Sequence, residues 1–76
     1  MGRVEKRLAA YLIDLSESSG GSLRVRIPMT MKELASYLGT TPETLSRKLR
    51  YMEDNNLIAR HRRDVIIRSL QRLEGI

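Results

Sequence analysis

A chain of 76 residues has room for one domain with a small core, and without cysteine it has no disulfide framework or thiolate metal site to strengthen that core. Fourteen Lys and Arg residues against nine Asp and Glu give a formal net charge of +5, which favours a polyanionic partner such as DNA, RNA or an acidic membrane surface, although it also serves solubility. The longest apolar stretch, residues 8–13, is too short to span a bilayer and follows no signal-peptide pattern, so we expect a soluble, cytoplasmic protein.

The first predicted element is an amphipathic helix over about residues 3–17. Apolar residues recur along it at the spacing of one helical face, at Val4, Leu8, Tyr11, Leu12 and Leu15. Charged residues, Glu5 among them, fall largely outside that stripe. The pattern predicts a helix with one side on the core and the other in water.

A serine- and glycine-rich segment and a short strand follow. The paired glycines at residues 20–21 could cradle a phosphate, but no strand precedes them and no helix opens after them, so we interpret them as part of a connector. Apolar and charged residues alternate over residues 23–28, a run that Pro28 closes. This alternation predicts an edge strand whose outward Arg24 and Arg26 protect its edge from pairing.

Two helices with a short turn between them are predicted within residues 30–55. Thr30 and Glu33 have the spacing of a capping box, which marks the start of the first helix, and Gly39 ends it. Thr41 is placed to cap the second helix. Two helices joined by a glycine-containing turn of about four residues form a helix-turn-helix, although any helical hairpin can need a glycine there.

The segment after these helices has the pattern of a β-hairpin over residues 57–68. Two β-prone runs, residues 57–59 and 65–67, bracket the polar residues 60–64, where we expect the turn.

A short last helix is predicted over about residues 69–74, with Ser69 as its cap. The complete order is helix, strand, helix, helix, hairpin, helix. Over residues 1–76 this order indicates a single α+β domain, a winged helix-turn-helix with a three-helix core, a small antiparallel sheet and a wing hairpin.

The solvent face of the third helix carries groups that suit the edges of DNA bases. Its buried side is defined by Leu45, Leu49 and Met52, and the opposite side presents Glu43, Ser46, Arg47 and Arg50, with Thr44 and Tyr51 at the margin. An arginine fork can donate two hydrogen bonds to guanine, and a carboxylate can accept one from the cytosine amino group. Glu43 and Arg47 are also four residues apart, so a surface salt bridge between them is the alternative, and it is compatible with base contact.

The segment from Ile27 to Leu49, with Glu-x-x-Ser-Arg at Glu43, Ser46 and Arg47, resembles the Crp/Fnr family of bacterial transcription regulators. The resemblance continues through the wing and back into the first helix, so it covers nearly the whole chain. It implies that these three residues contact the bases of a DNA half-site.

By the same resemblance, residues 42–54 form the recognition helix in the major groove, on a half-site similar to TTGAT or TGTGA. The Ser-Arg form is similar to the Fnr and Dnr branch of the family. The Crp branch has an arginine where this chain has Pro42, so we expect no base contact from that position.

Contacts to the DNA backbone are expected from seven residues, namely Thr41, Thr44, Lys48, Arg50, His61, Arg62 and Arg63. Lys48 stands where the family usually has an apolar residue, so we expect its stem to cover the core while its ammonium reaches a phosphate. The alternatives are a helix cap for Thr41 and a solvated turn for the three wing residues.

Neither an enzyme nor a metal centre is indicated. The sequence offers no nucleophile–base pair, carboxylate dyad, phosphate loop or ligand cluster, and His61 is its only histidine. We therefore expect no cofactor and no metal in this domain. The alternative function is a winged helix used for protein–protein, RNA or non-specific nucleic-acid contacts, for which Tyr51 is the only candidate anchor on the third helix.

The resembled family places this domain after a sensor domain and a dimerisation helix. We therefore expect a domain cut from a longer, homodimeric regulator whose partners are a palindromic double-stranded operator and RNA polymerase, and not a membrane. Alone, the domain should be largely monomeric and bind one half-site weakly, because the contribution of the second half-site is lost.

Overall fold

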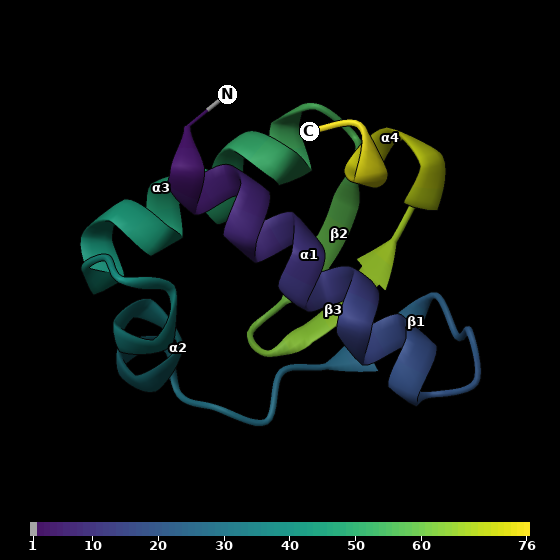
Figure 1. Ribbon diagram of the computed structural model, residues 1–76, viewed down its shortest axis with the longest axis horizontal. Helices are drawn as coiled ribbons and strands as arrows, with labels where there is room; N and C mark the ends of the chain where they lie inside the picture. The colour runs from purple at the N-terminus through teal and green to yellow at the C-terminus, as the bar shows by residue number, and fades with distance from the viewer. Residues whose placement is uncertain (1) are drawn as a thin grey trace.

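Within residues 2–76, which the computed structural model describes, seven helices and strands follow one another in the predicted order (Figure 1). They are α1 (Arg3–Ser18), β1 (Arg24–Arg26), α2 (Met31–Leu38), α3 (Pro42–Asp54), β2 (Ile58–His61), β3 (Asp64–Ile67) and α4 (Leu70–Glu74). Each bound lies within two residues of its expected position, the usual uncertainty at a fraying helix or strand end. The predicted fold class, an α+β winged helix-turn-helix, is confirmed.

Helix α1 crosses the domain in front of the other elements in Figure 1 and buries one stripe. Leu8 and Leu12 are fully buried, and Ala9 is 3% exposed. Glu5 is only 5% exposed, so the expectation that it lies outside the stripe was wrong. The reason is the helical period: Glu5 precedes Leu8 and Ala9 by three and four residues, which puts all three on one face.

Helix α2 is capped at both of its ends, and its C-terminal cap begins the turn to α3. At the start of α2, Glu33 N donates to Thr30 Oγ1 at 3.1 Å and Thr30 N donates to Glu33 Oε1 at 2.9 Å, the predicted capping box. At its end, Gly39 has a left-handed φ of +76°. Arg7 of α1 donates from Nη1 to the carbonyl of Leu38 at 3.2 Å, which places a cation at the negative end of the helix dipole.

Helix α3 begins as predicted, with Thr41 Oγ1 accepting from Thr44 N. Its buried side is the expected one, since Leu45, Leu49 and Met52 have no exposed surface. The chain then leaves the helix at Asn56, whose φ of +58° reverses the backbone direction.

The three strands form an antiparallel sheet in the order β1-β3-β2. Val25 and Val65 pair and are buried in the core, whereas Arg24 and Ile66 pair on the outer face. Because β1 is an edge strand of three residues with an exposed arginine at each end, the predicted protection of this edge fits its position.

The core is one apolar cluster to which all three larger helices and the sheet contribute.

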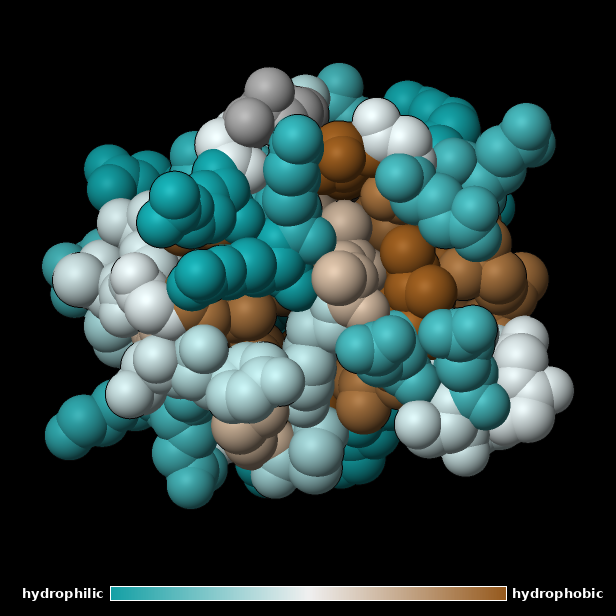
Figure 2. Space-filling view, in the orientation of Figure 1, coloured by the Kyte–Doolittle hydropathy of each residue, from teal (hydrophilic) through white to brown (hydrophobic). Residues whose placement is uncertain are grey.

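On the face shown in Figure 2, apolar surface gathers where α1 and α4 lie side by side. Among residues 2–76, no helix combines the length and apolar character that a membrane crossing requires.

Replacing Gly39 with alanine should lower the free energy of unfolding by about 1–2 kcal/mol, because a Cβ is disfavoured in the left-handed region. That Cβ would also lie 3.1 Å from Nη1 of Arg7. Urea unfolding followed by circular dichroism measures the change. Ser36→Ala, at an exposed helical position of α2, is the control and should shift stability by less than about 0.5 kcal/mol. Equal stabilities of the two variants would contradict this account of the turn.

Candidate nucleic-acid interface

The exposed face of α3 presents the three predicted base-contacting side chains together. Glu43, Ser46 and Arg47 are all exposed and lie within the first two turns of the helix. In the described part of the chain, Glu43 and Arg47 form no ion pair, so the salt bridge considered as an alternative is not made. The carboxylate and the guanidinium are therefore both available to an external partner.

Two threonines support the guanidinium of Arg47 from the start of α3. Thr41 Oγ1 donates to Thr44 Oγ1 at 3.1 Å, and Arg47 Nη2 donates to the same oxygen at 3.3 Å. Thr41 is thus a helix cap, as the alternative proposed, and its hydroxyl also belongs to this chain of hydrogen bonds. These hydrogen bonds direct the Arg47 side chain toward the N-terminal turn of the helix, the end that enters a major groove first.

Lys48 has a partner that the sequence analysis missed. Its Nζ lies 2.9 Å from Oε1 of Glu5 on α1. The hydrogen bond from Lys48 lowers the pKa of the Glu5 carboxyl, and the backbone amide of Gly2 lowers it further, whereas burial acts in the opposite direction. Two features of the sequence together could have indicated this pair. They are a carboxylate at a position of the buried face of α1 and a lysine where the resembled family usually has an apolar residue.

Arg50 remains accessible on the outer side of α3. Its Nε lies 3.8 Å from Oδ1 of Asp54, and the two side chains are 79% and 68% exposed. Such an exposed pair contributes little free energy, so it does not hold Arg50 away from a phosphate.

The wing is shorter at its tip than the sequence suggested. His61 of β2 pairs with Asp64 of β3, so the turn consists of Arg62 and Arg63 alone instead of residues 60–64. His61 and Arg62 are exposed, and Arg63 is half-buried. Arg62 has a φ of +58°, a left-handed conformation that costs a residue with a Cβ about 1–2 kcal/mol.

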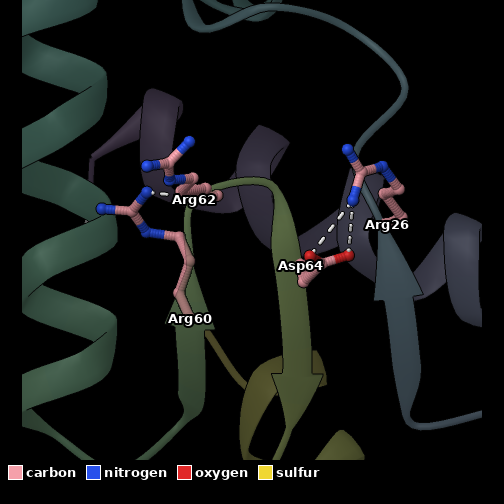
Figure 3. Close-up of polar contacts among 4 residues, drawn as sticks. All are labelled: Arg26, Arg60, Arg62 and Asp64. Carbon is pink, nitrogen blue, oxygen red and sulfur yellow. Dashed lines mark hydrogen bonds and ion pairs between the residues drawn. The ribbon is translucent and has the colours of Figure 1, made fainter.

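Arginine side chains connect the wing to its neighbours, and Figure 3 shows two of their contacts, the Arg60–Arg62 hydrogen bond and the Arg26–Asp64 ion pair. On the α3 side, Arg60 donates from Nη1 to the carbonyl of Arg62 at 2.9 Å, and its Nε lies 3.4 Å from Oε2 of Glu53. On the β1 side, Arg26 Nη1 lies 3.0 and 3.1 Å from the two oxygens of Asp64. The Arg60–Glu53 contact joins the wing to α3, whereas the Arg26–Asp64 pair, whose side chains are 62% and 59% exposed, contributes little free energy to the link with β1.

No group of three or more His, Cys, Asp or Glu side chains that could hold a metal ion occurs between residues 2 and 76.

A helix-turn-helix whose second helix exposes a polar face, followed by a braced hairpin, defines a winged helix-turn-helix domain. The chain belongs to the family of Crp-like helix-turn-helix domains, whose family model matches residues 6–76. The nitrogen fixation regulation protein FixK of Rhizobium meliloti is 44% identical over 54 residues, which are 71% of this chain and 26% of that protein. The probable transcriptional regulator flp of Lacticaseibacillus casei is 41% identical over 71 residues, 93% of this chain and 32% of that protein.

Solved structures are similar over almost the whole domain. DNR from Pseudomonas aeruginosa superposes with a TM-score of 0.85 at 31% identity, covering 96% of this chain and 33% of its own. FixK2 from Bradyrhizobium japonicum superposes with a TM-score of 0.86 at 26% identity, and the match covers 95% of this chain and 37% of the FixK2 chain. The chain spans 26–32% of the length of the two curated relatives, so it corresponds to one domain of such regulators.

Two substitutions at the wing tip separate backbone strain from charge. Arg62→Gly and Arg62→Ala remove the same cation, but only glycine adopts a positive φ without a steric penalty. We expect the glycine variant to be more stable than the alanine variant by about 1 kcal/mol. Thermal unfolding at matched salt provides the comparison, and an alanine variant of equal or higher stability would show that the turn has a different conformation.

Proposed function

We propose that this chain binds double-stranded DNA sequence-specifically, with α3 as the recognition helix in the major groove. The observation that carries the proposal is the exposed trio of Glu43, Ser46 and Arg47 on the N-terminal half of α3, free of ion pairs with one another. Membership in the Crp-like family supports the same function.

Each member of the trio has a role that its chemistry suits. The Arg47 guanidinium can donate a bidentate pair to O6 and N7 of a guanine, and the Glu43 carboxylate can accept from a cytosine amino group on the opposite strand. The Ser46 hydroxyl can donate to or accept from a neighbouring base. Together they suit a half-site of the TTGAT or TGTGA type.

Backbone phosphates are the proposed partners of the cations and hydroxyls around this trio. Thr44 and Arg50 flank it on α3, and His61, Arg62 and Arg63 provide the wing contacts. Thr41 lies at the helix start, where exposed amides and the helix dipole favour an anion. Positive charges along α3 and the wing attract DNA of any sequence, and the trio then discriminates between base sequences.

The complete regulator is proposed to bind a palindromic operator as a homodimer, one such domain on each half-site, and to act on transcription together with RNA polymerase. In this domain the proposed function needs no cofactor, because hydrogen bonds and charge perform the recognition.

The proposal predicts that affinity depends on the half-site. Duplexes carrying TTGAT, TGTGA and scrambled half-sites should be titrated with this chain at low, stated salt, with fluorescence anisotropy as the measurement. Binding should be tightest to one of the two family-like sites. Equal affinity for all three duplexes would leave only non-specific charge attraction and would refute the proposal.

The trio and the wing should respond differently to mutation. Arg47→Ala should cost about 1–3 kcal/mol on the preferred duplex and flatten the preference, because a base contact is lost. Arg62→Gly keeps the wing backbone and removes one phosphate contact, so it should weaken all duplexes alike and reduce the salt slope. Undiminished sequence preference in Arg47→Ala would show that α3 does not make the base contacts.

A further inference from the structure

The Glu5–Lys48 pair joins the first turn of α1 to the middle of the proposed recognition helix. Both oxygens of Glu5 are occupied, since Oε1 lies 2.9 Å from the ammonium of Lys48 and Oε2 accepts from the amide of Gly2. The Glu5 side chain is 7% exposed and that of Lys48 36% exposed. The lysine is therefore held by a carboxylate that water hardly reaches.

Each member of the pair needs the other. A buried carboxylate without a cation is costly, whereas a paired and hydrogen-bonded one is tolerated. A lysine at the margin of a helix, with a four-carbon stem and no partner, would extend its ammonium toward water or a nearby anion. In this fold the carboxylate directs that extension toward α1.

The pair is adjacent to the groups that contact bases in the proposal. Lys48 directly follows Arg47, and both line a hollow of about 300 Å³ together with Glu5, Thr44 and Tyr51. The hydrogen bond between Arg47 and Thr44 belongs to the same hollow. A shift of α3 about its axis would therefore lengthen the ion pair and move the guanidinium at the same time.

We propose that Glu5 is a positioning residue for DNA recognition: it holds the Lys48 ammonium against α1 and away from phosphate, and so fixes the rotation of α3 that presents Arg47. This inference rests on the proposed function. It replaces the expectation that Lys48 contacts the DNA backbone, and it adds to the recognition surface a residue that touches no DNA.

Salt dependence separates this role from a merely structural one, because the slope of log affinity against log salt counts phosphate contacts. Glu5→Gln keeps the shape of the side chain and frees Lys48 to reach a phosphate. The slope should therefore steepen by about 0.9, the value for one added phosphate contact. The ratio of affinities for preferred and scrambled duplexes should fall severalfold, because non-specific binding rises and α3 is no longer held.

The double variant Glu5→Gln/Lys48→Met removes both charges and leaves no unpaired buried ion, so it remains measurable if a single variant unfolds. Its slope should equal that of the wild type, because Lys48 contributes no phosphate contact there. Glu17→Gln removes an exposed charge from the same helix and is the matched control, with slope and ratio expected to stay unchanged.

Two results would overturn the inference. One is a double variant whose slope is shallower than the wild type by about 0.9, which would place Lys48 on a phosphate in the wild type. The other is a Glu5→Gln variant with the slope and preference of the wild type. A wild-type chain with no preference for any half-site would instead refute the proposed function itself, so the two failures are distinguishable.

Discussion

The burial of one side of α3 is the constraint on which the rest of this domain depends. Leu45, Leu49 and Met52 have no exposed surface and share one apolar cluster with Leu8 and Leu12 of α1. In a helix of 3.6 residues per turn, burying that side turns the residues in between toward solvent. The exposed polar face of α3 is thus a direct consequence of core packing, and the turn before the helix sets the angle at which it is presented.

Polar contacts then fix what apolar packing leaves adjustable. A hydrophobic face permits small rotations and slides, whereas an ion pair or hydrogen bond has a preferred length and direction. The α1 contact through Glu5 restrains α3 on one side, and Arg60 joins its far end to the wing through Glu53. The helix and the wing are therefore joined into one continuous surface, which suits a partner as regular as a DNA duplex.

Two of the fourteen cations illustrate why charge alone is a poor guide to an interface. Lys48 and Arg60 lie in the segments that the sequence assigns to recognition and to the wing, yet both are partly buried in internal ion pairs. Arg50 and Arg62 lie in the same segments and remain exposed. In the wing the difference comes from position, because Arg60 pairs with the inward Val65, whereas Arg62 lies in the turn beyond the last strand pair.

The sequence by itself determined the order of elements, the capping residues at Thr30 and Thr41, and the exposed trio on α3. Each of these follows from residues a few positions apart, whose spacing fixes caps and helical faces. Only the tertiary structure decided the partners of Lys48, Arg60 and Arg26, and the two-residue turn at the wing tip. Arg26 and Asp64 are 38 residues apart, and Glu5 meets Lys48 only once two helices have packed, so no local pattern specifies either pair.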